Sequence, residues 1–247
     1  LMKYTTFITP DSPREPKLGA MRDNTVIDLH AAQSWAQGAR SLPPEPLPPS
    51  LFELIHAGGS AELYARKLLN ELDQVDALNA KGAHKVRVGW RLDEVQLYPP
   101  LPRPMSLRDF YGFENHVKAA YANIGRDIPE VWFEFPAFYY TSTNSIFGTN
   151  EGVPYPKYTQ ALDFELEIAC VIGKIGRDIR IENAHQHIFG YMIMNDWSAR
   201  DIQKKEMKML GPAKSKDFAT SLGPYLVTPD ELSDRTTDRA TVYDLAM

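Results

Sequence analysis

The sequence predicts an α+β fold that is mostly β. The clearest indication is the strict alternation of apolar and acidic residues at 162–168, because a period of two is typical of a strand with one wet and one buried face. The apolar run at 188–194 predicts a second, more buried strand. Residues 61–78 instead have apolar side chains at helical spacing. Strands and helices are therefore both expected, in separate stretches of the chain.

Length and composition are those of an ordinary globular protein. The 247 residues can bury one large core or one core with a smaller attachment. A net charge of −5, from 27 basic and 32 acidic residues, provides no basic surface for nucleic acid. The sequence has neither an apolar stretch near the roughly 18–20 residues of a membrane span nor a signal peptide at its start. Cys170 is the single cysteine and is expected in the core. We therefore expect a cytoplasmic protein without nucleic-acid or membrane partners.

Residues 1–100 are expected to form a small N-terminal α/β module. Short apolar runs within 5–29, broken by prolines and a glycine, predict a small sheet. The proline-rich segment 41–50 predicts an extended loop, and helices are predicted at 51–56 and 61–78. The second helix has an apolar stripe that we interpret as core packing, formed by Leu63, Ala65, Leu68, Leu69, Leu72 and Val75.

A proline-rich connection at 95–104 marks the expected boundary with a catalytic domain at residues 101–247. Asp196 or Ser198 is positioned to cap a helix in this second domain. Its expected elements, in order, are a helical stretch at 108–124, strands near 132–140 and 162–173, a helix around 182–186, a strand at 188–195, a helix at 198–206, a loop at 211–224 and a strand at 225–228.

Acidic side chains share one face of the strand predicted at 162–168. Glu165 and Glu167 would lie roughly 7 Å apart along it and repel each other unless water or a cation lies between them. Asp196, at the end of the apolar strand, would complete an oxygen-rich site for a hard divalent ion. An acidic face turned to water would show the same alternation. Asp196 favours the metal site, because an unpaired carboxylate at the end of an apolar strand would be costly. Either a bound cation or Arg200 is expected to compensate its charge.

Two further residues are candidates for chemistry. His116 follows Asp109 by seven positions in an aromatic-rich segment, where a histidine is usually structural; its ordinary pKa nevertheless suits proton transfer near neutral pH. Lys216 lies in a loop where lysine is ordinarily a solvated charge, but beside an acidic metal site it would stabilise charge on a substrate oxygen. His185 and His187 share no helix face and have no cysteine framework, so zinc is not expected.

Together these stretches resemble the fumarylacetoacetate hydrolase family. The resemblance runs from about residue 106 to 228 and depends on four segments in order, 109–116, 163–167, 195–203 and 216–224. It implies a mixed β-roll catalytic domain, commonly a homodimer, with Mg²⁺ (or Mn²⁺ or Ca²⁺) as cofactor. Thr220 matches a residue near the metal, and Tyr139 or Tyr140 a further substrate contact. The remaining roles implied are metal ligation by Asp109, Glu165, Glu167 and Asp196, general base catalysis by His116, charge stabilisation by Lys216, and substrate binding by Tyr111, Arg200 and Gln203.

The chain departs from the family at its end, because no Gly-Thr turn follows Pro224 before Met247; we expect a truncated sequence. The activity implied is hydrolysis of a carbon–carbon bond in a 1,3-dicarbonyl acid, an acylpyruvate or a fumarylacetoacetate-like compound. Decarboxylation, isomerisation or hydration of a related 2-oxo or enol acid would use the same metal site. A metal-stabilised binding protein without activity is a further alternative.

Overall fold

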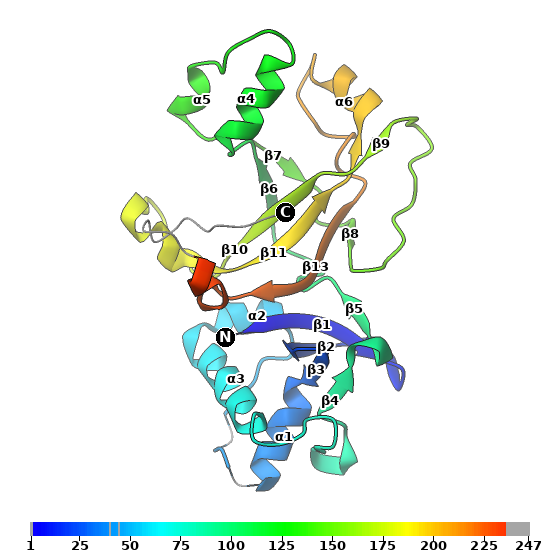
Figure 1. The fold of residues 1–247 in the computed structure, drawn as a ribbon, viewed down its shortest axis with the longest axis vertical. Helices are drawn as coiled ribbons and strands as arrows, with labels where there is room; N and C mark the ends of the chain where they lie inside the picture. The colour runs from blue at the N-terminus through cyan, green and yellow to red at the C-terminus, as the bar shows by residue number, and fades with distance from the viewer. Residues whose placement is uncertain (1, 40, 44, 236–247) are drawn as a thin grey trace.

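One large sheet runs through both halves of the chain (Figure 1). The structure is a computed structural model that describes residues 2–39, 41–43 and 45–235. Within them the sheet has nine strands, in the order β10-β11-β13-β1-β2-β3-β4, with β5 beside β1 and β8 beside β13. The predicted α+β class is confirmed. The strands are β1 Lys3–Thr9, β2 Ser12–Arg22, β3 Thr25–Asp28, β4 Gly89–Arg91, β5 Gln96–Tyr98, β8 Ile146–Phe147, β10 Leu166–Ile172, β11 Ile188–Asp196 and β13 Thr220–Val227.

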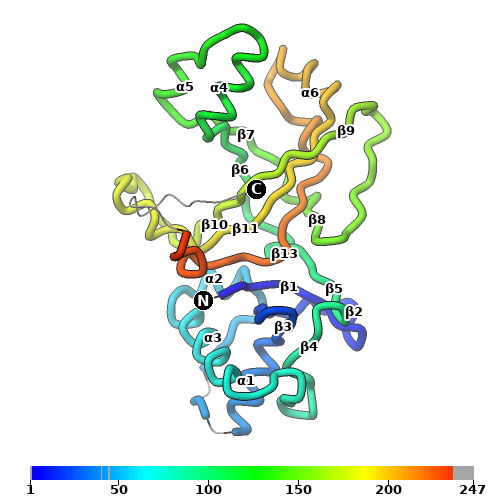
Figure 2. The backbone as a smooth tube through the Cα atoms, viewed as in Figure 1, coloured from blue at the N-terminus to red at the C-terminus, as the bar shows by residue number. Residues whose placement is uncertain are grey.

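Three helices pack on the N-terminal strands, at the blue and cyan end of the tube in Figure 2. They are α1 (Leu29–Ala39), α2 (Leu51–Ala57) and α3 (Gly59–Leu72). Their shared core joins Leu18 and Ile27 of the strands to apolar side chains of all three helices. The predicted stripe of α3 is correct for Ala65, Leu68, Leu69 and Leu72, all of which are buried.

Two members of that stripe were predicted wrongly. The side chain of Leu63 is 54% exposed, because at 3.6 residues per turn it lies on the opposite side of α3 from the buried residues. Val75 is exposed because α3 ends at Leu72 and does not continue to residue 78. Cys170, expected in the core, is also exposed on β10.

The large sheet continues across the two predicted parts of the chain. The segment 95–104, expected to be only a connection, contains β5, which pairs with β1. β1 also pairs antiparallel with β13, with Lys3 opposite Val227 and Tyr4 opposite Leu226. The proposed boundary near residue 100 thus lies just after β5, while the backbone hydrogen bonds of one sheet join residues from both sides of it.

Up to residue 235, where the described part ends, the second half adds two small sheets and three α-helices. β6 (Leu107–Phe110) pairs with β7 (Phe138–Thr141), and β9 (Leu162–Asp163) pairs with β12 (Ser198–Ala199). Figure 1 shows α4, α5 and α6 at the end of the molecule away from α1. The helices are α4 Glu114–Ala122, α5 Val131–Glu134 and α6 Arg200–Glu206, and four 3-10 helices cover Ala83–Lys85, Leu92–Glu94, Ile181–His187 and Pro229–Arg235.

Several predicted elements differ from these bounds. The helical stretch at 108–124 begins as β6, and the strand near 132–140 begins as the short helix α5. The helix at 198–206 starts only at Arg200, without a side-chain cap from Asp196 or Ser198, because residues 198–199 pair with β9. β13 begins at Thr220, earlier than the predicted 225. Of the helices described, none has both the length and the apolar character to cross a bilayer.

Candidate metal and substrate site

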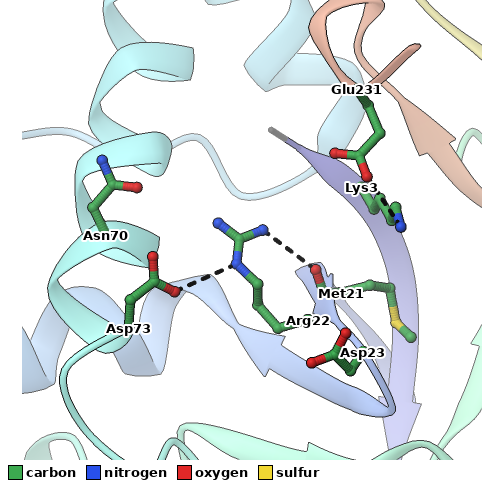
Figure 3. Close-up of a pocket in the computed structure, with 7 residues that line it drawn as sticks. All are labelled: Lys3, Met21, Arg22, Asp23, Asn70, Asp73 and Glu231. Carbon is green, nitrogen blue, oxygen red and sulfur yellow. Dashed lines mark hydrogen bonds and ion pairs between the residues drawn. The ribbon is translucent and has the colours of Figure 1, made fainter. Parts of the chain in front are cut away.

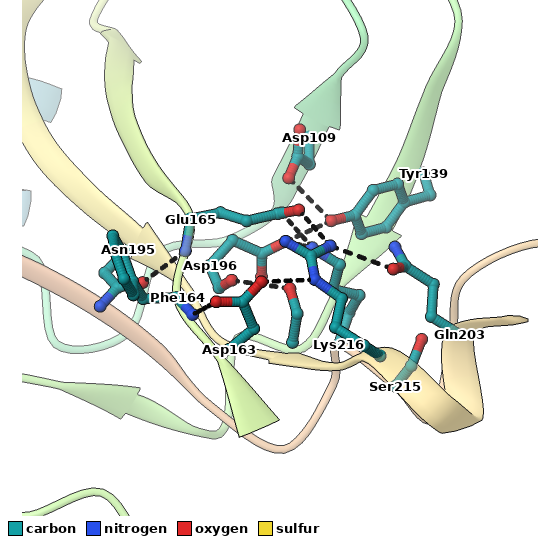
Figure 4. Close-up of polar contacts among 12 residues, drawn as sticks. Asp109, Tyr139, Asp163, Phe164, Glu165, Asn195, Asp196, Gln203, Ser215 and Lys216 are labelled. Carbon is teal, nitrogen blue, oxygen red and sulfur yellow. Dashed lines mark hydrogen bonds and ion pairs between the residues drawn. The ribbon is translucent and has the colours of Figure 1, made fainter. Parts of the chain in front are cut away.

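Four carboxylates from three parts of the chain meet at one site, and Figure 4 shows three of them, Asp109, Glu165 and Asp196. Asp109 lies on β6, Glu165 just before β10, Glu167 on β10, and Asp196 at the end of β11. One oxygen of each lies within 4.8 Å of the others. The antiparallel register explains the meeting: Leu166 lies opposite Asn195 in the β10–β11 pair, so Glu165 lies opposite Asp196 and shares its face.

The predicted strand at 162–168 is interrupted between Asp163 and Leu166. The backbone N–H of Glu165 donates to Asn195 Oδ1 at 3.0 Å instead of joining a regular ladder. Asp163 and Glu165 still point to one side, where Arg200 binds both: Nε donates to Asp163 Oδ2 at 2.8 Å and Nη1 to Glu165 Oε1 at 2.6 Å. Asp163 therefore serves as an ion-pair partner of Arg200.

Lys216 brings a buried positive charge to the same carboxylates. Its side chain is 2% exposed, and Nζ donates to Asp196 Oδ2 at 2.6 Å and to Glu165 Oε2. The expectation for an ordinary loop lysine, a solvated charge, does not apply here. Gln203 lies one helical turn after Arg200 on α6, and its Oε1 accepts a hydrogen bond from Arg200 Nη1 at 3.1 Å. The carboxylates nevertheless outnumber the two cations, so negative charge remains uncompensated.

The excess negative charge appears in the pKa values. Burial, with the neighbouring Asp109, Asp196 and Glu165, raises the pKa of Glu167 to about 8. Burial also raises the pKa of Asp196 to about 6, although Lys216 acts in the opposite direction. Burial opposes ionisation of Glu165 too, but Lys216 and Arg200 outweigh it and lower its pKa. A cation placed among these groups would favour their ionised forms.

Asp196 offers a direct test of whether a metal fits. The residue is 1% exposed, and its Oδ1 has no hydrogen-bond partner among the described residues. A buried carboxylate oxygen without a partner is costly, and a ligated cation would remove that cost. An all-carboxylate donor set suits Mg²⁺, Mn²⁺ or Ca²⁺. The cluster is therefore compatible with a divalent metal ion held by Asp109, Glu165, Glu167 and Asp196.

Tyr139 was considered beside Tyr140 from the sequence, and the structure distinguishes them. The Tyr139 hydroxyl lies between two of the carboxylates, 2.7 Å from Asp109 Oδ2 and in contact with Asp196 Oδ2. Burial and these two carboxylates raise its pKa. Tyr140 points away on the other face of β7, 63% exposed. The signal that identifies Tyr139 is the pairing of β6 with β7, in which Asp109 lies opposite Tyr139.

His116 and Tyr111 lie apart from the carboxylate cluster. His116 is exposed on α4, and its ring meets the ring of Tyr111 edge-on at a centroid distance of 5.5 Å. Within the part of the chain that the structure describes, no hydrogen bond or ion pair joins either residue to the four carboxylates. The structure thus brings seven of the nine predicted site residues together, Asp109, Glu165, Glu167, Asp196, Lys216, Arg200 and Gln203. The role of His116 as a base stays a prediction.

Thr220, matched to a residue near the metal, lies in β13 directly opposite Asp196 of β11 and is buried.

A separate hollow of about 400 Å³ lies in the other half of the molecule (Figure 3). Four of its five charged side chains form ion pairs, Lys3 with Glu231 at 3.0 Å and Arg22 with Asp73 at 3.6 Å. Met21, Asp23 and Asn70 complete its lining, so it contains no residue of the carboxylate cluster.

Comparison with known proteins places the chain in a family. The family model for the C-terminal part of fumarylacetoacetate (FAA) hydrolase matches residues 106–245, more than half of the chain. Fumarylacetoacetase of Bos taurus is 30% identical over 256 residues, which cover 94% of this chain and 60% of that protein. Oxaloacetate tautomerase YisK of Bacillus subtilis is 31% identical over 213 residues, 86% of this chain and 65% of that protein. The chain thus spans less than two thirds of either relative.

The fold has a solved counterpart. A fumarylacetoacetate hydrolase from the psychrophile Exiguobacterium antarcticum superimposes with a TM-score of 0.60 at 23% sequence identity, covering 95% of this chain and 69% of that one. At this identity the likeness concerns the fold alone. The family assignment comes from the sequence match, which includes all four carboxylates and Lys216. The chain belongs to the fumarylacetoacetate hydrolase family of enzymes.

Proposed function

We propose that this chain provides the active site of a divalent-metal-dependent hydrolase that cleaves a carbon–carbon bond in a 1,3-dicarbonyl acid. The observation that carries the proposal is the buried carboxylate cluster with Lys216 beside it. The match to bovine fumarylacetoacetase along nearly the whole chain supports hydrolysis over the other reactions of such sites. An acylpyruvate or a fumarylacetoacetate-like acid is the proposed substrate class.

The four carboxylates, Arg200, His116 and Lys216 each have a role in the proposed reaction. A divalent ion held by the four carboxylates would supply Lewis acidity to the oxygens of a bound dicarbonyl acid. Arg200, oriented by Gln203, binds the substrate carboxylate. His116 takes a proton from water as the water oxygen bonds to the distant carbonyl carbon. The carbon–carbon bond then breaks, and Lys216 stabilises the negative charge left on the departing enol oxygen until that fragment takes up a proton.

General base catalysis by a positioned histidine is worth roughly 10²–10⁴-fold, or about 3–5 kcal/mol. His116 lies on α4, outside the carboxylate cluster, so hydrolysis requires a substrate that extends from the cluster to this helix. Tyr111, in ring contact with His116, would contact the same end of the substrate.

Isomerisation or tautomerisation of a related 2-oxo acid is the second candidate. The position of His116 favours it, because moving a proton between carbon and oxygen needs no attacking water. The 31% identity to a protein named oxaloacetate tautomerase points the same way. Tyr139 and Lys216 already lie at the carboxylates, where such a proton would move.

One experiment separates the two candidates. The protein is incubated with an acylpyruvate, fumarylacetoacetate and oxaloacetate, with Mg²⁺ or Mn²⁺ or with EDTA, and products are followed by NMR. Hydrolysis gives two acids from the first two substrates, needs the metal, and is lost in His116→Ala but kept in His187→Ala, a histidine that hydrogen-bonds Lys174 elsewhere. Conversion of oxaloacetate between its keto and enol forms, unaffected by His116→Ala, would instead establish the tautomerase. No conversion of any substrate in Mg²⁺ or Mn²⁺ would exclude both.

We also propose that the protein is a homodimer. In support, three exposed aromatic side chains lie in contact on β6 and β7. The ring centroid of Phe138 is 5.0 Å from that of Phe110 and 5.6 Å from that of Tyr140. Apolar rings gathered on one surface are typical of protein interfaces. Light scattering coupled to size-exclusion chromatography tests this, and a mass corresponding to 28.0 kDa at micromolar concentration would contradict it.

A further inference from the structure

We infer that Glu206 is a positioning residue, which holds Lys216 against Glu165 and Asp196 by fixing the loop at residues 213–215. The inference depends on the proposed function only in taking Lys216 as a working residue of that site. Glu206 is the last residue of α6 and belongs to none of the four segments that carry the family resemblance.

The carboxylate of Glu206 collects four hydrogen bonds from three consecutive residues of the loop. The backbone N–H groups of Ala213, Lys214 and Ser215 donate to it at 3.0, 2.7 and 3.1 Å, and Ser215 Oγ donates at 2.6 Å. Only an ionised carboxylate can accept this many bonds without presenting a donor of its own. Glu206 therefore fixes the path of the backbone directly before Lys216.

The loop is held on its other side as well. The Ser215 carbonyl accepts a hydrogen bond from Ala199 N–H at 2.9 Å, and Lys216 N–H donates to the Ala213 carbonyl at 3.0 Å. The backbone leading to Lys216 is thus anchored to α6 through Glu206 and to β12 through Ala199. A lysine side chain has a flexible four-carbon stem, so a fixed backbone is needed to keep its ammonium group on two particular oxygens.

Helix α6 places both cations of the site relative to each other. Arg200, Gln203 and Glu206 follow at intervals of three residues, so each is a neighbour of the next on the helix surface. Arg200 at the beginning of α6 binds Glu165, and Glu206 at its end fixes the loop from which Lys216 binds the same Glu165. A seven-residue helix therefore sets the spacing between the guanidinium and the ammonium group.

Glu206 is ionised at neutral pH, as this role requires. Burial opposes ionisation, but the hydrogen bonds from Ser215, Ala213 and Lys214 outweigh it and keep the pKa of Glu206 below its usual value. In Glu206→Gln the size is nearly unchanged, but one acceptor oxygen becomes an amide N–H₂ that faces backbone N–H donors. This variant therefore weakens the hydrogen bonds between Glu206 and the loop at residues 213–215 with little loss of packing.

The first test follows the reactivity of lysine amines in the metal-free protein. N-acetylation with acetic anhydride, mapped by mass spectrometry, should leave Lys216 protected in the wild type, because it is buried, while the exposed Lys214 reacts. In folded Glu206→Gln we expect Lys216 to react at least tenfold faster and Lys214 at an unchanged rate. Glu94→Gln is the matched control, because Glu94 also accepts from a backbone N–H, that of Arg91, but in the N-terminal half.

Ser215→Ala is a second, milder variant, which tests the same inference if Glu206→Gln does not fold. It removes one of the four hydrogen bonds to Glu206 and should raise the acetylation rate of Lys216 by roughly two- to threefold. Circular dichroism and urea unfolding establish that each variant is folded. If Lys216 stays as protected in folded Glu206→Gln or Ser215→Ala as in Glu94→Gln, the inference is overturned.

The second test uses divalent metal affinity. The Lys216 ammonium occupies oxygens of Glu165 and Asp196, so it competes with a cation for them. Calorimetric titration with Mg²⁺ should show Lys216→Met binding roughly tenfold tighter, Glu206→Gln tighter in the same direction, and the double variant no tighter than Lys216→Met alone. Weaker binding by Glu206→Gln, or additive effects, would contradict action through Lys216. Neither test uses turnover, so an inactive protein would refute the proposed reaction while acetylation still decides the role of Glu206.

Discussion

Replacing Lys216 by methionine should destabilise the metal-free protein strongly. The ammonium group is 2% exposed and Asp196, its nearest fully buried partner, is 1% exposed. Removing one member of a buried ion pair leaves an uncompensated charge and typically costs about 3–5 kcal/mol. For a chain of this length, about 2–4 °C of melting temperature is lost per kcal/mol, so the expected loss is about 6–20 °C.

The pH dependence identifies the cause of that loss. Lys216 lowers the pKa values of Glu165 and Asp196, so both values rise when the lysine is removed. A carboxyl group whose pKa is higher in the folded than in the unfolded state binds more protons when folded, so its contribution to stability decreases as pH rises. The difference between wild type and Lys216→Met should therefore be small at pH 5 and largest at pH 8.

The assay is urea unfolding in EDTA at pH 5, 6, 7 and 8, followed by circular dichroism. Arg91→Met is the control, because Arg91 pairs with Asp93 at 2.8 Å with both side chains largely exposed, and such pairs contribute little to stability. A Lys216→Met protein within 1 kcal/mol of wild type at pH 8 would refute the reasoning. So would a loss that does not change with pH, because lost packing alone has no such dependence.

Three further outcomes are expected. In EDTA the melting temperature of the wild type should fall as pH rises from about 4.5 to 8, because Glu167 has a folded-state pKa of about 8. Saturating Mg²⁺ should flatten this slope, and a melting temperature that rises with pH would contradict the burial of Glu167 among the other carboxylates. Tyr139→Phe should cost about 1.5–3 kcal/mol in urea unfolding, because it removes a hydrogen bond to charged groups, while Tyr140→Phe should stay within about 0.5 kcal/mol; equal effects would disprove the distinction between them. Leu68→Ala should cost about 2–5 kcal/mol and Leu63→Ala under about 0.5 kcal/mol by the same assay, since only Leu68 is buried; the reverse order would mean that the face of α3 is assigned incorrectly.

The site could be predicted further than the fold around it. Residue types and their order along the chain were enough to select Glu165, Glu167 and Asp196, because hard cations need oxygen ligands and few other arrangements tolerate such acids near apolar strands. The interruption of the strand after Asp163 could not be predicted. Its alternation is regular on both sides of the break, where Glu165 and Asp163 bind Asn195 and Arg200, which lie 30 and 37 residues away in the sequence.

Other misses share this cause. Residues 107–110 form a strand because residues 138–141 lie beside them, and that pairing also brings Tyr139 to Asp109. No local period shows which distant strands will pair, so neither β6 nor the choice of Tyr139 over Tyr140 could be predicted from sequence. The stripe of α3 failed only where the helix ended early or where a leucine lay off the buried side. Glu206 escaped for a related reason: its hydrogen bonds are to backbone groups, whose positions the sequence does not record.

The pairing of β1 with β13 has a consequence for biosynthesis. β1 hydrogen-bonds to a strand that is made more than 200 residues later, with Met2 O accepting from Thr228 N–H at 3.1 Å. Until then β1 has β2 and β5 beside it among the described strands, and the part of its edge that later pairs with β13 is open to another chain. Closing so long a loop is slow. The nascent polypeptide should therefore depend on holding chaperones while the second half is being translated.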